Sequence, residues 1–331
     1  MNQPTLIVDN LKTHFFGRSG VAKAVDGVSF SIQPGEILGL VGESGSGKSM
    51  TGYSIMGLID PPGRVVDGSI KLKGKELRGL SEREMRAIRG DRIAMIFQDP
   101  MMTLNPVLRI DTQMIEAVAA HRQVSARRAR EMARDALARV GIPSPDERLL
   151  AYPHQFSGGM RQRVAIAIAL LNAPDLIICD EPTTALDVTI QAQILYEMQK
   201  LCRESGTALI WITHDLSVVA GLADTVSVMY AGKVIESGSV KDVLERPLHP
   251  YTQGLIASAP SRNPRGRPLK QIPGSTPSLL NLPSGCAFRE RCAYANADCI
   301  NDPVQTVTDG RTFRCYHPIE FGGIEVVGAK R

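Results

Sequence analysis

The sequence predicts an α/β fold, in which buried parallel strands are combined with helices. Three short apolar runs, Ile37–Val41, Leu176–Cys179 and Ala208–Thr213, have the length and composition of strands that are buried on both faces. Two longer stretches, Ile110–His121 and Ala126–Val140, repeat apolar residues at helical spacing. Strands of this kind mixed with helical stretches indicate a layered domain of both element types.

Further strands are expected at both ends of this pattern. Leu6–Val8 and Val28–Ile32 are predicted strands of a small β region, with a turn at Phe16–Gly20. Val226–Tyr230 and Lys233–Glu236 are the last predicted strands, and Ala231-Gly232 joins them as a hairpin.

The length and composition of the chain are those of a globular protein with one large domain or two domains of ordinary size. The chain has 331 residues, 43% of them hydrophobic, and its mean hydropathy is −0.06. A net charge of +4 is too small to indicate nucleic-acid binding by itself. The most apolar run, Val164–Leu171, is far shorter than the roughly 20 residues of a membrane span, and Met1–Pro4 does not begin a secretory signal. The cytosol is therefore the expected compartment, where cysteines stay reduced.

One glycine-rich stretch fits the phosphate-binding loop G-x-x-x-x-G-K-[ST]. It follows the predicted strand Ile37–Val41 and precedes a helical stretch, Met50–Ile59, which is the context that this loop requires. Its glycines let backbone N–H groups turn toward phosphates, Lys48 reaches the β and γ oxygens, and the Ser49 hydroxyl suits Mg²⁺. The structural alternative is a Gly/Ser turn with a surface lysine. The expected nucleotide ligands are Gly42, Glu43, Ser44, Gly45, Ser46, Gly47, Lys48, Ser49 and Met50.

Phe15 lies upstream of this loop, where its ring could stack on an adenine base. The residue type fits a hydrophobic core equally well, so both interpretations stay open.

A second anion site is predicted far along the chain, at Ser157-Gly158-Gly159. These residues precede an apolar helix, and a helix start combines N–H donors with the positive end of the helix dipole.

Polar residues also follow two of the buried strands. Asp180 and Glu181 end the strand Leu176–Cys179; we expect Asp180 to hold Mg²⁺ through water and Glu181 to align or activate the attacking water. His214 follows the strand Ala208–Thr213, and we favour a γ-phosphate contact over a purely structural histidine.

In this order, the motifs resemble the ATP-binding subunit of ABC transporters over about residues 1–245. The set comprises Gly42–Ser49, Gln98, Ser157–Gly159, Leu176–Glu181, Thr184-Ala185-Leu186-Asp187 and His214. The order and the Ser-Gly-Gly element exclude the GTPase, kinase and helicase branches of the phosphate-loop class. The resemblance implies a RecA-like P-loop ATPase core (1–98 and 175–245) with an N-terminal antiparallel β subdomain, a helical signature subdomain (99–174) and a C-terminal extension containing cysteines (246–331).

The resemblance also implies a head-to-tail pair of subunits closing over two ATP molecules. Each ATP would be held by one phosphate loop and by Ser157, Gly158, Gly159 and Met160 of the other subunit. Gln98 would be a catalytic residue with Glu181 and His214, and it would begin a loop that senses the nucleotide and touches the membrane subunits. Ser49, Gln98 and Asp180 would hold Mg²⁺. Asp187 would communicate across the pair, and Phe15 would stack on adenine. Met160 stands where many relatives have Gln, which removes a polar contact but keeps the backbone donors and Ser157.

Five shorter segments look like the dipeptide, oligopeptide and nickel importer branch, and within it the dipeptide-type subunit. They are Phe97–Pro100, Leu104–Pro106, Tyr152–Gln155, Asp187–Gln193 and His249–Thr252. The implied function is ATP hydrolysis that powers uptake of di- or oligopeptides. The implied partners are a second, homologous ATP-binding subunit, two transmembrane permeases and an extracytoplasmic substrate-binding protein, with this chain peripheral at the cytoplasmic face of the inner membrane. The alternatives are a soluble ABC ATPase acting on nucleic acid or the ribosome, and a nucleotide-binding regulator without turnover.

Four of the six cysteines, Cys286, Cys292, Cys299 and Cys315, follow one another with the spacing C-x5-C-x6-C-x15-C. Clustered thiols in a reducing compartment favour a metal over disulfides. Their spacing alone leaves a [4Fe–4S] cluster and Zn²⁺ equally open. The resemblance implies an iron–sulfur cluster that is bound by all four, and zinc or unligated thiols are the alternatives.

Overall fold

The computed structural model describes residues 3–183, 187–259, 263, 266, 268 and 270–319, and the chain divides into two units. Unit 1 is built around Leu72–Trp211, together with Met1–Leu6 and Ile32–Ile37. Unit 2 comprises Ile7–Ser31, Leu38–Lys71 and Ile212–Arg331. The phosphate loop and the four clustered cysteines therefore belong to unit 2, whereas Gln98, the Ser-Gly-Gly stretch and Asp180-Glu181 belong to unit 1.

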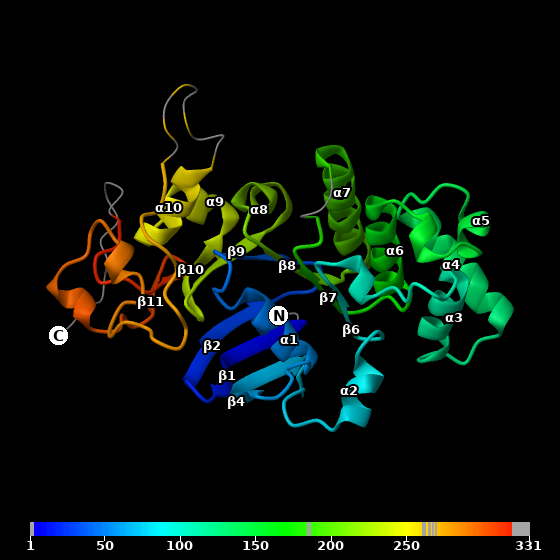
Figure 1. Ribbon diagram of the computed structural model, residues 1–331, viewed down its shortest axis with the longest axis horizontal. Helices are drawn as coiled ribbons and strands as arrows, with labels where there is room; N and C mark the ends of the chain where they lie inside the picture. The colour runs from blue at the N-terminus through cyan, green and yellow to red at the C-terminus, as the bar shows by residue number, and fades with distance from the viewer. Residues whose placement is uncertain are drawn as a thin grey trace. The chain divides into compact units, whose positions relative to one another are not determined.

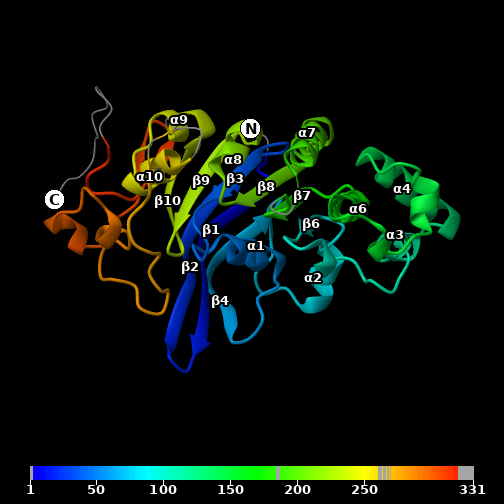
Figure 2. The same cartoon turned by 45° about the horizontal axis from the view of Figure 1, so that its top comes forward.

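In unit 2 a small sheet has the strand order β2-β1-β4. Its strands are β1 (Leu6–Gly17), β2 (Gly20–Ile32) and β4 (Gly63–Leu72), drawn in blue shades in Figures 1 and 2. Helix α1 (Lys48–Met56) contacts this sheet, because Ser54 Oγ on the helix lies 2.7 Å from Thr13 Oγ1 on β1. The sheet thus supports the helix that follows the phosphate loop.

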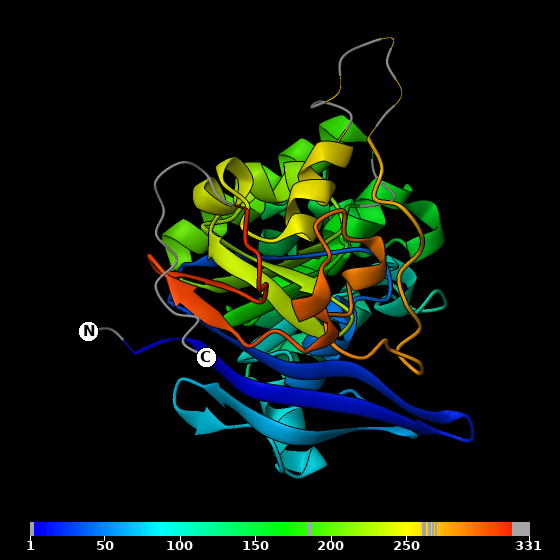
Figure 3. The ribbon, with the colours of Figure 1, turned by 90° about the vertical axis from the view of Figure 1, so that its left-hand side faces the viewer.

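A second series of strands in unit 2 has the order β11-β12-β10-β9-β3. Strand β3 (Ile37–Val41) runs parallel to β9 (Thr225–Tyr230), and β9 forms an antiparallel hairpin with β10 (Lys233–Ser239). The C-terminal extension adds β12 (Arg311–Phe313) to β10 and β11 (Thr306–Thr308) to β12; Figure 3 shows this red hairpin beside the yellow-green strand.

The helices of unit 2 in the described residues are short. Besides α1, they are α8 (Leu216–Leu222), α9 (Val240–Glu245), α10 (Pro250–Ser258) and the 3-10 turns η4 (Arg289–Arg291) and η5 (Ala297–Ile300). One buried cluster joins the strands to the extension, because Tyr230, Tyr251 and Phe288 pack ring against ring with centroids 4.7–5.4 Å apart. The C-terminal extension therefore shares a core with the strands beside the phosphate loop.

Unit 1 combines strands with a group of helices, drawn from cyan (α2) to green (α7) in Figure 1. Strand β6 (Ile93–Ile96) is parallel to β7 (Leu176–Asp180), and β8 (Ala208–Thr213) follows in the order β8-β7-β6. The helices are α2 (Glu82–Ile88), α3 (Ile110–Ala119), α4 (Ala126–Arg139), α5 (Pro145–Leu149), α6 (Gly158–Leu170) and α7 (Val188–Ser205). Strand β5 (Lys75–Glu76) and the turns η1 (Pro100–Met102) and η2 (Pro153–Gln155) complete the described elements of the unit.

The α/β prediction and most of its elements are confirmed. Helices α3 and α4 lie within the stretches Ile110–His121 and Ala126–Val140, and the hairpin turns at Ala231-Gly232. The first two strands were predicted too short: β1 and β2 form one long hairpin, because its half-exposed polar residues hide the alternation. No helix in the described ranges is long and apolar enough to cross a bilayer. The division into core, helical subdomain and extension stays a prediction.

Candidate functional site

The phosphate loop packs directly against backbone, and this packing requires glycine at two positions. Gly42 has φ 155, and a Cβ there would lie 2.3 Å from the Met229 carbonyl oxygen. Gly47 has φ 102, and a Cβ there would lie 2.2 Å from the Ala24 carbonyl oxygen. Any side chain at either position would clash with these carbonyl oxygens and displace the loop.

Lys48 is turned inward and is only 5% exposed. Its ammonium group donates hydrogen bonds to the carbonyl oxygens of Gly42 (2.8 Å) and Glu43 (2.9 Å) and approaches Ser46 Oγ at 3.4 Å. Helix α1 begins at Lys48 without a side-chain cap on its N-terminus. The loop therefore combines a buried cation with the positive end of a helix dipole, the arrangement that suits an anion.

The other predicted nucleotide ligands of unit 2 lie in the loop itself, on helix α1, on β1 and after β8. Ser44 and Gly45 are exposed, while Ser49 and Met50 are half-buried on the first turn of α1. Phe15 is half-buried on β1, and its ring lies so close to Gly63 that a Cβ there would meet Cε1 at 2.5 Å. His214 is exposed directly after β8. The roles of all six residues stay predictions.

In unit 1 the structure brings two predicted residues together at the ends of neighbouring strands. Ile96 and Cys179 are register partners in the parallel pair β6–β7, so Gln98 and Glu181 emerge at the same edge of the sheet. Gln98 Nε2 lies 3.5 Å from Glu181 Oε2. Asp180 is only 3% exposed, and Glu181 has the left-handed backbone conformation at φ 46, which is uncommon for a residue other than glycine.

The Ser-Gly-Gly stretch begins a helix, as predicted. Ser157 is the N-cap of α6 and accepts a hydrogen bond from the Met160 N–H at 3.3 Å, while Gly158 and Gly159 occupy its first turn. A Cβ at Gly158 would meet nothing within 4 Å, so this end of the helix is open. Asp187 caps α7 in the same way and accepts from the Ile190 N–H at 3.0 Å. Thr184, Ala185 and Leu186 lie outside the described residues.

The four clustered cysteines come from different parts of the extension and line one small hollow of about 20 Å³. Burial raises the pKa of the Cys286 and Cys292 thiols and raises that of Cys315 to about 12. Within the described residues, no three His, Cys, Asp or Glu side chains have the arrangement of a metal site. The thiols therefore share a hollow without showing a coordination geometry.

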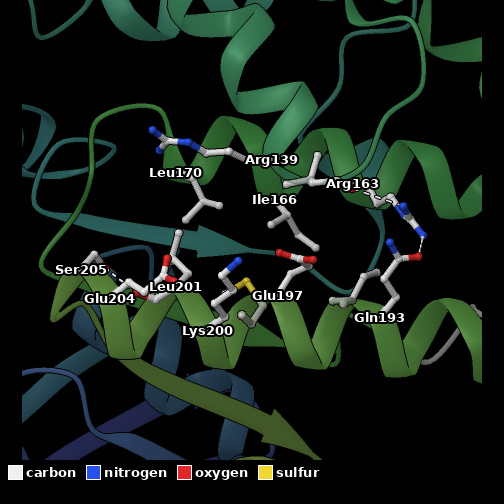
Figure 4. A pocket seen from close by; sticks show the side chains of 13 residues that line it. Arg139, Arg163, Ile166, Leu170, Gln193, Glu197, Lys200, Leu201, Glu204 and Ser205 are labelled. Atoms are coloured by element: carbon white, nitrogen blue, oxygen red, sulfur yellow. Dashed lines mark hydrogen bonds between the residues drawn. The ribbon is translucent and has the colours of Figure 1, made fainter.

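A larger cavity of about 420 Å³ lies elsewhere in unit 1, between α6 and α7 (Figure 4). At one end of it Arg163 Nη2 donates a hydrogen bond to Gln193 Oε1 at 2.6 Å, and Ile166 and Leu201 contribute apolar walls. None of the predicted site residues lines this cavity.

Sequence analysis missed the residues that contact the phosphate loop from the C-terminal extension. Arg291 and Thr276 bind the Glu43 carboxylate, and the Tyr251 hydroxyl accepts the Glu43 N–H. Arg291 is 248 positions from Glu43 in the chain, and no motif that we identified links them.

Comparison with known proteins places these features in one family. The ABC transporter family model matches residues 25–184, and the model of the oligopeptide/dipeptide transporter C-terminal region matches residues 235–299. The dipeptide transport ATP-binding protein DppD of Bacillus subtilis is 50% identical over 317 residues, which are 95% of either chain. The oligopeptide transport ATP-binding protein OppD of Salmonella typhimurium is 47% identical over 95% of this chain and 94% of its own.

Solved structures with a similar fold are also ATP-binding cassettes. The ATP-binding cassette MJ0796, solved as a dimer in a post-hydrolysis state with ADP and Pi, has a TM-score of 0.65 and 27% identity, covering 71% of this chain and 98% of its own. Both the N-terminal cassette and the C-terminal region therefore have relatives, and the chain belongs to the ATP-binding proteins of the dipeptide and oligopeptide ABC transporters.

Proposed function

We propose that this chain hydrolyses ATP to ADP and phosphate and thereby powers uptake of di- or oligopeptides by an ABC importer. The observation that carries the proposal is the match along 95% of the chain to proteins named for dipeptide and oligopeptide transport, joined to a phosphate loop of suitable geometry. The same relatives weigh against an ATPase that acts on nucleic acid or the ribosome.

The phosphate loop would hold the triphosphate. The inward-facing Lys48 and the backbone of Gly42–Ser49 are suited to the β and γ phosphates, and the ring of Phe15 is assigned to the adenine base. For Mg²⁺ we assign Ser49, Gln98 and Asp180. Oxygen donors of this type are the ligands that Mg²⁺ prefers, and when bound the ion would neutralise phosphate charge.

Hydrolysis would depend on the sheet edge of unit 1. We assign Glu181 to accept a proton from the attacking water. Gln98, whose Nε2 lies 3.5 Å from Glu181 Oε2, would orient the same carboxylate. We assign His214 to the γ-phosphate. The uncommon backbone conformation of Glu181 supports the role assigned to Glu181, because strained backbone is concentrated at functional sites.

Two such subunits would act as a head-to-tail pair. Each ATP would lie between the phosphate loop of one subunit and Ser157, Gly158, Gly159 and Met160 of the other, with Asp187 communicating between the sites. The open start of α6 supports this, since its dipole suits a γ-phosphate offered by a partner. The partner is proposed to be a second, homologous ATP-binding subunit.

Transport would require two membrane permeases and an extracytoplasmic substrate-binding protein. The chain would sit at the cytoplasmic face of the inner membrane as a peripheral subunit, a location inferred from its likeness to transport ATP-binding proteins.

For the C-terminal extension we propose that Cys286, Cys292, Cys299 and Cys315 hold a [4Fe–4S] cluster, with Zn²⁺ as the alternative. Four sulfur donors around one hollow fit either group in donor chemistry. Either group would supply positive charge that favours the thiolate form of cysteines whose pKa is otherwise raised.

The transport proposal is tested with the complete complex in proteoliposomes. We expect accumulation of a labelled dipeptide only with the substrate-binding protein and with ATP on the side of this subunit, and no accumulation with the Glu181→Gln chain. Nickel uptake without dipeptide uptake would overturn the peptide assignment, and ATP hydrolysis without uptake of either would overturn the importer.

A further inference from the structure

The Glu43 carboxylate in the phosphate loop is bound by two side chains of the C-terminal extension. Arg291 Nη1 donates to Oε2 at 2.6 Å and Nη2 to Oε1 at 2.9 Å, a bidentate pair, and Thr276 Oγ1 donates to Oε2 at 2.9 Å. The Arg291 side chain is only 6% exposed. A bidentate pair whose arginine is shielded from water is stronger than an exposed ion pair.

Arg291 is itself fixed by its surroundings. Its Nε donates to the Pro273 carbonyl oxygen at 2.8 Å, and Nη1 also reaches the Tyr230 hydroxyl at 3.3 Å. The guanidinium lies 5.8 Å from the Tyr230 ring and 5.9 Å from the Phe288 ring, both of which belong to the shared core. The guanidinium therefore meets Glu43 in one defined orientation.

The backbone of Glu43 is held as well. Its N–H donates to the hydroxyl of Tyr251, a fully buried residue of α10, at 2.8 Å, and its carbonyl oxygen accepts from Lys48 Nζ at 2.9 Å. One residue of the phosphate loop is thus tied through its side chain and its N–H to the extension, and through its carbonyl to the phosphate-binding lysine.

The charge on Glu43 matters for a nucleotide. The hydrogen bond from Arg291 keeps the pKa of the Glu43 carboxyl below its ordinary value against the opposing effect of burial, so the group is an anion at neutral pH. The carboxylate also interacts with the charge of Lys48. An uncompensated anion here would repel the phosphates and draw Lys48 away from them.

We propose that Arg291 is a positioning residue for nucleotide binding: with Thr276 and Tyr251 it fixes Glu43 and neutralises its charge, so that the C-terminal extension sets the affinity of the phosphate loop for ATP. This assigns the extension a task at the nucleotide site that is separate from any metal it holds.

The test measures Mg-ATP affinity of the full-length subunit by calorimetry and its thermal unfolding midpoint without nucleotide. Arg291→Gln leaves Glu43 charged and unpaired, and we expect about tenfold weaker binding that partly recovers at high salt. Glu43→Gln in the same chain removes the stranded charge, so the double variant should bind more tightly than Arg291→Gln alone. The control is Arg246→Gln, which breaks an exposed arginine–aspartate pair in the same unit and should leave affinity unchanged.

A purely structural role predicts a lower unfolding midpoint with unaltered affinity. The proposal is overturned if folded Arg291→Gln binds ATP within twofold of the parent, or if the double variant binds more weakly than Arg291→Gln. If Arg291→Gln does not fold, Tyr251→Phe and Arg291→Lys take its place, because they keep the packed ring and the charge respectively. Each should weaken binding about threefold, and parental affinity in both would equally overturn the proposal.

Discussion

Gln98 and Glu181 meet at 3.5 Å, although 83 positions separate them in the chain. The contact follows from topology: β6 and β7 are parallel neighbours, and both residues lie just beyond the carboxyl ends of these strands. In parallel sheets, ligands usually bind at the edge formed by the carboxyl ends of the strands, where such polar side chains emerge. This places an amide donor beside the carboxylate to which we assign activation of water.

Glu181→Gln should lower ATP hydrolysis by a factor of about 100 or more while Mg-ATP binding persists. The substitution removes the proton acceptor and preserves size, and general-base catalysis is worth roughly 10²–10⁴ in rate. Phosphate release and nucleotide affinity are the two measurements. Glu116→Gln, at an exposed position on α3, is the matched control and should hydrolyse ATP at the parental rate. Undiminished turnover by the Glu181 variant would remove this residue from the mechanism.

Gly47→Ala should abolish measurable ATP binding. A Cβ at this position would lie 2.2 Å from the Ala24 carbonyl oxygen, and the backbone has φ 102, so the loop must move away from its support. Gly79→Ala is the control: it has a similar left-handed φ of 83 but no atom within 4 Å of the added Cβ, so it carries only backbone strain of about 1 kcal/mol. Calorimetric titration with ATP separates the two variants, and equal affinities would contradict the steric argument.

The phosphate loop and the buried strands could be predicted from sequence because their signals are local. The apolar run Ala208–Thr213 matches β8 to the residue, and the helix start after Ser157 follows from its capping chemistry. The hairpin of β11 and β12 was missed because each strand is only three residues long. A signal existed, since Asp309-Gly310 is a typical hairpin turn and both residues have positive φ.

The contacts of the C-terminal extension could not be predicted in this way. Glu43 reads as one variable position of a loop motif and Arg291 as one arginine among many, and only the folded chain brings them together. The same is true of Glu236, a fully buried carboxylate on β10 that pairs with Arg311 at 2.6 Å. Such pairs depend on tertiary packing and leave no periodic trace in the sequence.

Ser157→Ala should lower hydrolysis by the assembled pair while ATP binding to the single subunit remains. The Ser157 hydroxyl caps α6, so its loss costs about 1 kcal/mol of helix stability. The substitution also removes a hydrogen-bond donor that we assign to the partner's ATP. Ser125→Ala isolates the first effect, because Ser125 caps α4 through the Arg128 N–H at 3.2 Å. Turnover and thermal midpoints of both variants are compared. Equal losses of turnover would show that capping alone explains the effect.

Acid should destabilise unit 2 through His249, and His249→Asn should reduce that sensitivity. Burial lowers the pKa of His249 to about 3, so the folded chain keeps this ring neutral while the unfolded chain binds a proton below about pH 6.5. The unfolded state therefore binds more protons than the folded state between pH 6.5 and about 3. The contribution of neutral His249 to the free energy of unfolding is fully present above this window. It falls by roughly 1.4 kcal/mol per pH unit as the pH drops through the window. Asn does not titrate and can accept the Tyr251 N–H that His249 Nδ1 now accepts at 3.0 Å. Urea unfolding at pH 7 and pH 5 measures the difference, and an identical pH dependence in both proteins would contradict it.

Cys292→Ala should change both the metal content and the nucleotide affinity of the protein. Cys292 lines the hollow that the four thiols share, and it directly follows Arg291, whose guanidinium holds Glu43. Anaerobically purified parent protein should contain about four iron atoms per chain if the cluster is [4Fe–4S], and the variant should lose them. Because the 3-10 turn Arg289–Arg291 ends at Cys292, we expect a rearrangement there to loosen the Arg291 contact and weaken Mg-ATP binding. Cys202→Ala removes a buried thiol of α7 and should keep the iron and the affinity of the parent. Zinc in place of iron in the parent protein would show that the four cysteines bind Zn²⁺. Loss of metal with unaltered ATP affinity in the variant would show that the cysteine hollow and the phosphate loop act independently.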